Sequence, residues 1–385
     1  MWSKMAYPFY SLEYSGTLLD TNLNNVAFNI DTRDGLKTRV GTANFQVQNI
    51  DNDYIIAETG TKFKIDDSVD IYMGYSGSAQ IFSGFVNSIS EQCDLKQRNI
   101  KVSCVNKMER LLSTLDAKAY GVAGPNLTAS NILKDIITRV NGKKKPGSSE
   151  PDITVNNVTT TNLDITPYGY NYRPVMEILR EFSTPEKTGA GQFIYYIDKS
   201  NDLHFKPRPG IGGTTPTINE YNFTEFRATY EVFDIANYIV VNCGTDDNGN
   251  TIIALGTNWN SITTVGFRYK YVLKTEIGDG LKGQGLSVSD QRNAMRAQGE
   301  SWGNYIALLL GEPRWKIDCT MKGNYNYPGS SVQMITGEVV KVTSPSNWSG
   351  TKVLRVMDIR QSFTSRGWMT ELQLEEDDKT KVEPI

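Results

Sequence analysis

The sequence predicts a mainly β protein, with two related antiparallel β-barrels and a helix-containing α+β domain inserted between them. Three observations predict this fold class. Short segments of alternating apolar and polar residues, separated by turns, occur near both ends of the chain. One pattern of three such segments occurs twice. The 33 glycines and 20 tyrosines favour β structure with many turns.

Composition and charge limit the classes of function. The chain has 385 residues, which is long enough for two or three domains, and 39% of them are hydrophobic, as in a globular protein. Its formal net charge is -3, so no global basic field draws it to nucleic acid or to an anionic membrane surface. We therefore expect no sequence-specific nucleic-acid binding. No apolar run approaches the ~20 residues of a membrane span, and no signal peptide is recognisable.

Residues 1–112 are predicted to form the first barrel. Apolar residues alternate with polar ones in 26–30, 69–73 and 100–104, as in half-buried strands. Gly84 interrupts another strand and indicates a bulge or a close backbone contact.

Residues 113–207 are predicted to form the inserted α+β domain. Apolar residues from 127 to 140 have helical spacing, with Asn126 or Thr128 as the N-cap and Gly142 at the end. A second helix is predicted at 174–182, followed by a hairpin whose turn lies at 199–202.

The rest of the chain is predicted to be a linker, the second barrel and a tail. Residues 208–218 are rich in Gly, Pro and Thr, as in a linker. The second barrel is predicted at 219–375 and includes a hairpin around Asn248-Gly249. It also includes a long helix at 290–310, capped by Ser287 or Ser289. Residues 376–385 form the C-terminal tail.

An internal repeat links the two predicted barrels. The segments SVDI, GFVNSI and KVSC of the first half correspond in order to SVQM, LRVMDI and ELQL of the second. Ile89 and Val102 are 13 residues apart, as are Ile359 and Leu372. We therefore predict that the copies superpose with Val69 on Val332 and Ile89 on Ile359, with a loop in the second copy lengthened near Trp348.

These motifs resemble a known family. The pattern DSVDIYMGYSG, then IFSGFV, then IKVSC resembles the first barrel of tail hub (baseplate hub) proteins of tailed phages and contractile injection systems. The long helix followed by YPGSSV, GTKVLRV and TELQL resembles the second barrel. The family's turn before the strand usually ends in an acidic group, and Pro328-Gly329-Ser330 departs from that pattern.

The resemblance implies a structural role in a phage tail. Members are homotrimers whose six barrels form a quasi-six-fold ring that joins a six-fold tail tube to a three-fold tip. The implied partners are two further copies of this chain, a tail tube or distal tail protein and a tip spike or fibre protein, with a tape-measure protein as another candidate. The implied location is the baseplate or tip of the virion tail, after assembly in the host cytoplasm.

The sequence predicts no catalytic, cofactor-binding or metal-binding residue. His204 is the one histidine, and no Ser or Cys nucleophile is identifiable beside it. GDGLKGQG lacks the spacing of a phosphate loop, and 246–250 is too short for a helix–loop–helix calcium site. The acidic run 375–378 and the basic run 143–145 are interpreted as solvated. The four cysteines, with no CxxC pair, are predicted to be free: Cys93, Cys104, Cys243 and Cys319.

Two other functions stay open from the residues. The first is a glycan or peptidoglycan hydrolase whose catalytic carboxylates lie in the inserted domain, with Asp135, Glu177 and Glu181 as candidates. The second is a carbohydrate-binding adhesin, which only the aromatic content supports. Cell-wall hydrolysis would favour the first and glycan binding by a monomer the second.

Overall fold

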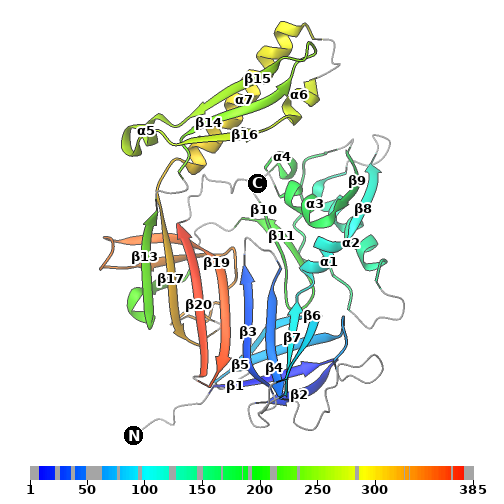
Figure 1. Cartoon of the computed structure of the whole chain (residues 1–385), viewed down its shortest axis with the longest axis vertical. Coiled ribbons are helices and arrows are strands. Elements are labelled where there is room, and N and C mark those ends of the chain that lie inside the picture. The colour runs from blue at the N-terminus through cyan, green and yellow to red at the C-terminus, as the bar shows by residue number, and fades with distance from the viewer. Residues whose placement is uncertain are drawn as a thin grey trace. The chain divides into compact units, whose positions relative to one another are not determined.

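The computed structural model divides the chain into two compact units (Figure 1). The first comprises 1–227 and 317–375, and the second 228–316 and 376–385. The structure describes the following ranges: 8–21, 27–35, 40–48, 63–75, 79–93, 98–120, 127–144, 151–165, 168–183, 185–189, 193–208, 215–231, 235–281, 286–324, 326–328, 330–365 and 367–376.

Thirteen strands form one large sheet, and the chain is mainly β as predicted. Its order is β13-β17-β20-β19-β3-β4-β7-β6-β5-β1-β2, with β18 beside β19 and β12 beside β18 (Figure 1). The N-terminal strands are β1 (Phe9–Tyr14), β2 (Thr17–Thr21), β3 (Ala27–Gly35), β4 (Thr42–Gln48), β5 (Ser68–Gly74), β6 (Ala79–Cys93) and β7 (Arg98–Val105). The later strands are β12 (Thr217–Asn219), β13 (Glu225–Glu231), β17 (Arg314–Lys322), β18 (Val339–Thr343), β19 (Thr351–Thr364) and β20 (Gly367–Glu376).

Alternating burial of side chains creates the core beside the N-terminal strands. In β4 the side chains of Ala43, Phe45 and Val47 are fully buried, while the residues between them are half-buried and Gln48 is exposed. β5 alternates in the same way, as the sequence predicts. Gly84 lies where a Cβ would come within 2.2 Å of the Val105 carbonyl oxygen, so the expected close backbone contact is present. Strands from both predicted barrels belong to one hydrogen-bonded sheet, and closure into two barrels stays a prediction.

A short turn opens the first copy of the repeat. The Asp66 amide donates to the Val86 carbonyl, and the Val86 amide donates to the Asp67 carbonyl, each at 2.9 Å. Asp66 has φ of 73°, and the chain then enters β5. The turn and the two strands that follow form one unit with β7, because β5 pairs with β6 and β6 with β7.

The same turn opens the second copy, but eight residues later than the sequence comparison places it. The Gly337 amide donates to the Val356 carbonyl at 2.8 Å, and the Val356 amide donates to the Glu338 carbonyl at 3.0 Å. Gly337 has φ of 86°, matching the left-handed conformation of Asp66. The order β18-β19-β20 then repeats the order β5-β6-β7. Gly337-Glu338 therefore supplies the acidic turn that Pro328-Gly329-Ser330 lacks.

The predicted superposition of Val69 on Val332 is consequently wrong. Val332 is 38% exposed and lies outside any strand, whereas Val69 is fully buried in β5. The alternation in SVQMI imitates a strand, but its one ladder contact is an isolated bridge from Gln333 to Asn326. The predicted match of Ile89 with Ile359 agrees with the turn, since each residue follows its turn-bound valine by three positions.

The inserted α+β part folds around its own core. Its elements are α1 (Met108–Ser113), β8 (Leu115–Tyr120), α2 (Ala129–Asn141), β9 (Tyr168–Pro174), α3 (Val175–Phe182), α4 (Pro185–Thr188), β10 (Phe193–Ile197) and β11 (Leu203–Pro207). Thr128 caps α2 by accepting from the Asn131 amide, which decides between the two predicted caps. Phe182 and Phe205 are fully buried in this core.

Residues 228–316 form a separate α/β unit within the range predicted for the second barrel. A three-stranded sheet, β15-β14-β16, contains β14 (Tyr238–Thr245), β15 (Thr251–Thr257) and β16 (Tyr269–Leu273). The helices are α5 (Trp259–Val265), α6 (Glu276–Leu281) and α7 (Val288–Leu310), and Ser287 caps the long one. The sheet and α7 bury Ile239, Val241, Met295 and Ile306 between them. These strands thus complete a core of their own.

Candidate functional site

Two strands from opposite halves of the chain meet in the middle of the large sheet. Asp358–Phe363 of β19 pairs antiparallel with Ile30–Gly35 of β3. Arg33 forms an ion pair with Asp358 at 2.9 Å, and Arg360 forms one with Asp31 at 2.7 Å. Each arginine comes from one half and its carboxylate from the other, so the joint between the two copies of the repeat is held by backbone pairing and two reciprocal charge pairs.

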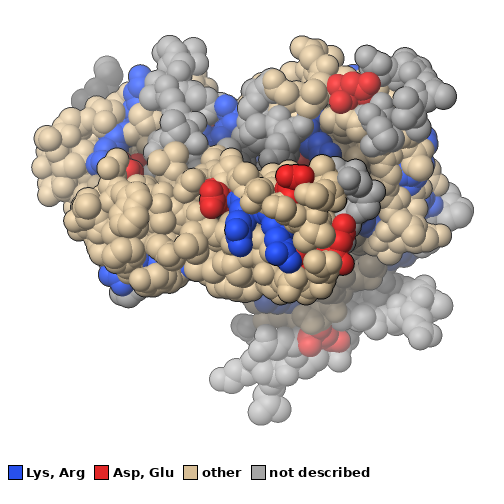
Figure 2. Space-filling view, turned by 90° about the horizontal axis from the view of Figure 1, so that it is seen from above, with Lys and Arg blue, Asp and Glu red and all other residues tan. Residues whose placement is uncertain are grey.

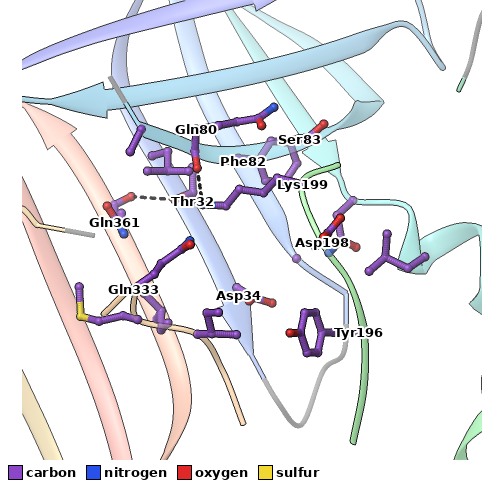
Figure 3. A pocket seen from close by; sticks show the side chains of 18 of the residues that line it. Thr32, Asp34, Gln80, Phe82, Ser83, Tyr196, Asp198, Lys199, Gln333 and Gln361 are labelled. Atoms are coloured by element: carbon purple, nitrogen blue, oxygen red, sulfur yellow. Dashed lines mark hydrogen bonds between the residues drawn. The ribbon is translucent and has the colours of Figure 1, made fainter. Parts of the chain in front are cut away.

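A cavity of about 460 Å³ lies between β3, β6 and the β10–β11 hairpin (Figure 3). Lys199, at the tip of this hairpin, extends into it and donates to the Gln80 carbonyl of β6. Burial lowers the pKa of Lys199 to about 8, although the carboxylates of Asp34 and Asp198 act in the opposite direction. Thr32, which also lines the cavity, donates to the Gln361 carbonyl at 3.4 Å (Figure 3). The cavity therefore contains the ammonium group of a half-buried lysine, already engaged by a backbone carbonyl.

The same hairpin also reaches the second copy of the repeat. Lys206 of β11 forms an ion pair with Glu338, the acidic residue of the turn before β18, at 2.7 Å. Lys199 and Lys206 thus attach one hairpin to β6 of the first copy and to the turn of the second. These contacts fix the inserted part against both copies, and the sequence offered no signal for them because each joins residues more than 100 positions apart.

Replacing Lys199 is expected to change how stability depends on pH. An unfolded lysine has a pKa near 10.4, so between about pH 8 and pH 10 the unfolded chain binds more protons at this site. Stability from this group therefore rises with pH in that window. Urea unfolding of Lys199→Met should lack this rise, while the exposed-site control Lys270→Met should keep it. Equal pH slopes for Lys199→Met and the unmodified protein would contradict this interpretation.

His204 has a structural environment in β11. Its Nε2 lies 2.9 Å from Asp198 Oδ2, and its ring stacks on Tyr196 with centroids 4.5 Å apart. The residue faces an aromatic ring and a carboxylate of its own hairpin, which supports the structural interpretation.

The three carboxylates considered for hydrolysis are each bound to basic or tyrosine side chains. Asp135 accepts from Lys118 and Tyr120 and pairs with Arg139. Despite burial, these hydrogen bonds lower the pKa of Asp135 to about 2. Glu181 pairs with Arg173 at 2.7 Å and accepts from Tyr168 at 3.1 Å, and Glu177 pairs with Arg173 at 3.8 Å. A general acid needs a raised pKa, so Asp135 has the opposite electrostatic environment.

The remaining motifs lie in a turn, a loop and the ends of two elements: residues 278–281 of GDGLKGQG belong to α6, and Glu375 and Glu376 end β20. Residues 246–250 form the predicted hairpin turn, in which Asp246 accepts from the amides of Asn248 and Asn250 and pairs with Arg292. Lys143 and Lys144 each form an ion pair within the inserted part. Lys145, residues 282–285 and 377–378 lie outside the described residues. Among those that are described, no group of three or more His, Cys, Asp or Glu could hold a metal ion.

The cysteine prediction agrees with the structure where the structure describes it. Cys104, Cys243 and Cys319 are free and buried. Burial raises the pKa of the Cys104 and Cys319 thiols, which makes both unreactive at neutral pH. The side chain of Cys93 lies outside the described part of the chain.

The unit at 228–316 exposes an apolar sheet face opposite α7. Side chains of β15, β14 and β16 form three rows across this face. The register of β14 with β16 places Tyr269 beside Tyr238 and Tyr271 beside Val240. Phe267 stacks on Tyr269 and meets the edge of Trp259. On this face and at its edge, the large exposed side chains are Ile253, Leu255, Trp259, Phe267, Tyr269, Tyr271 and Leu273. Contiguous exposed apolar surface of this kind is typical of protein interaction sites.

Charge on the molecular surface is distributed in small groups. Figure 2 shows basic and acidic side chains scattered over one face of the molecule, separated by broad uncharged areas.

Within the described residues, none of the helices is both long and apolar enough to span a bilayer.

Comparison with known proteins identifies the fold. No family model and no curated protein sequence matches the chain. Among solved structures, the 43 kDa tail protein of prophage MuSo2 from Shewanella oneidensis is similar, with a TM-score of 0.62 and 12% identity over 95% of this chain and 97% of that one. The chain shares the fold of a phage tail protein. The tail protein from Neisseria meningitidis MC58 is similar too, with a TM-score of 0.59 and 12% identity over 96% and 97% of the two chains.

Proposed function

We propose that this chain is a structural tail hub without catalytic activity. Three copies form a ring of six related β units, which joins a six-fold tail tube to a three-fold tip spike or fibre complex in the virion tail. The observation that carries the proposal is the duplicated turn–strand–strand unit whose two copies join edge to edge through β3 and β19. The fold shared with two tail proteins over nearly the whole chain supports it.

The joint between the copies explains why such a chain suits a ring. Two similar units that pair through different edges form a heterologous contact, and repetition of such a contact closes into a ring when the rotation fits. A chain with two units then gives six units from three copies. The ion pairs of Arg33 with Asp358 and of Arg360 with Asp31 hold the two β units of one chain in a fixed relation.

The apolar sheet face of the unit at 228–316 supports partner binding by the hub. Its exposed aromatic residues provide the kind of side chain that contributes most energy to protein interfaces. The partners proposed for the ring are a tube or distal tail protein, a tip protein and, as a further candidate, a tape-measure protein. Assembly in the host cytoplasm belongs to the same proposal.

Electron microscopy of the purified full-length protein tests this proposal. The expected particle is a ring with three-fold symmetry, a central channel and six similar lobes around it. Rings with five-fold or purely two-fold symmetry, or isolated chains at all concentrations, would overturn the hub proposal.

A further inference from the structure

The pairing of β19 with β3 within one chain predicts how two chains pair with each other. β3 and β13 occupy equivalent places in the two copies, because β3-β4-β7 and β13-β17-β20 have the same order in the sheet. β6 and β19 are equivalent too, since each is the long middle strand after the shared turn. Within one chain β19 of the second copy pairs with β3 of the first. The equivalent contact, β6 of the first copy with β13 of the second, does not occur in the sheet order.

The edge of β6 that this contact needs pairs with no strand in the described part of the chain. The valine of each turn, Val86 or Val356, marks equivalent positions 270 residues apart. Asp358–Phe363 of β19, which pairs with β3, therefore corresponds to residues 88–93 of β6. β5 pairs with β6 only as far as Phe85, so no described strand pairs with that edge of 88–93.

The equivalent segments of β19 and β6 differ in burial, as expected if a strand covers the first and none covers the second. Asp358 is 8% exposed and Ile359 is 7% exposed where β3 lies beside them. Their counterparts in the first copy, Ser88 and Ile89, are exposed and half-buried. The segment of the first copy thus has the equivalent position, but no described strand covers it.

The strand β13 has the edge that would pair with this segment of β6. It lies at the end of the large sheet with β17 as its neighbour, and its other edge pairs with no described strand (Figure 1). Its sequence contains Glu225-Phe226-Arg227, which repeats the acidic-x-Arg spacing of Asp31-Thr32-Arg33 in β3. In β3 these two charged residues form the ion pairs across the joint. β13 therefore repeats the charge spacing of β3, although β6 has Ser88 and Ser90 at the positions of Asp358 and Arg360.

We propose that β6 of one chain pairs antiparallel with β13 of a second copy and so continues the large sheet from chain to chain. This inference rests on the proposed hub function and names its subunit contact. The register follows from aligning Glu225 with Asp31, which places Arg227 at the position of Arg33. Within the chain Arg33 pairs with Arg360, and Arg360 corresponds to Ser90 of β6. The expected partners are Ser90 with Arg227 and Ser88 with Thr229. An open edge filled by another copy also removes an aggregation hazard.

Cysteine cross-linking of the full-length protein tests this contact. Opposite side chains on paired strands have Cβ atoms about 4.5–5.5 Å apart, within reach of a short bis-maleimide. In a Cys93→Ser background, Ser90→Cys combined with Arg227→Cys should give covalent dimers and trimers, as should Ser88→Cys with Thr229→Cys. The control variant combines Ser90→Cys with Thr351→Cys. Thr351 is exposed, and the proposal does not place it beside Ser90 of a neighbouring chain.

The oligomeric state separates the failure of this inference from the failure of the hub proposal. Both pairs should cross-link in a preparation whose size, measured before the reagent is added, is trimeric. A trimer that gives no more cross-linked species with either pair than with the control would overturn the β6–β13 contact and leave the hub proposal standing. A protein that is monomeric at all concentrations would overturn both.

Discussion

Replacing Asp116 with alanine is expected to lower the free energy of unfolding by about 3–5 kcal/mol, the range for breaking a buried ion pair. The side chain is only 3% exposed. It accepts hydrogen bonds from Arg139 Nε at 3.2 Å, from the Tyr170 hydroxyl at 2.7 Å and from Lys143 at 3.2 Å. The variant leaves the Arg139 guanidinium, which joins β8 to α2, without its main carboxylate. Urea unfolding at pH 7 measures the loss.

The control for this variant is Asp152→Ala. The Asp152 side chain is 69% exposed and pairs with Lys144, so its loss should cost far less stability than the loss of Asp116. Equal losses for the two variants would contradict the role assigned to Asp116.

Acid should remove the stabilisation by Asp116. Burial alone would raise its pKa, but the hydrogen bonds from Arg139, Tyr170 and Lys143 outweigh burial and hold the pKa well below its usual range. The carboxylate therefore stabilises the fold fully above its unfolded pKa of about 3.9 and progressively less as pH falls below it. The difference in stability between the unmodified protein and Asp116→Ala should shrink on acidification through that range.

Replacing Gly256 with valine is expected to destabilise the unit at 228–316 by about 3 kcal/mol or more, at the upper end of overpacking effects. A Cβ at this position in β15 would lie 1.9 Å from the carbonyl carbon of Gly303 in α7. Because the obstacle is helix backbone, the helix and the sheet must separate. Hydrogen exchange in β14 and β15 should accelerate, while exchange in the inserted core around Phe182 should not change.

A glycine outside such a contact provides the comparison. Gly142 ends α2 with φ of -70°, and a Cβ there would meet nothing closer than 3.5 Å. Gly142→Ala should change stability by less than about 0.5 kcal/mol, as is usual for surface substitutions. Protection of β14 and β15 that stays unchanged in Gly256→Val would show that the helix does not depend on this contact.

The sequence predicts best the elements that local patterns determine. Thr128 before the apolar spacing of α2, and Ser287 before α7, are caps that act within one turn. The turn at 246–250 is local as well. Such features need no knowledge of distant residues.

The elements that sequence reasoning missed depend on distant contacts. α7 was assigned to a barrel because nothing local indicates that Gly256 and Gly303, 47 positions apart, let it pack on β15. The error at Val332 arose because alternation over four residues cannot distinguish a strand from a loop with one bridge. Gly337-Glu338, read against Asp66-Asp67, was the available signal for the correct register. The Lys199 contact has no such signal.

The mass of the intact assembly tests the central claim most directly. Native mass spectrometry of the purified protein, alone and within the tail complex, should give three copies, a mass three times that of the 43.0 kDa chain. Three copies with two β units each match the six-fold tube and the three-fold tip at once. One copy or six copies would contradict the account, because neither number lets two units per chain make a ring of six.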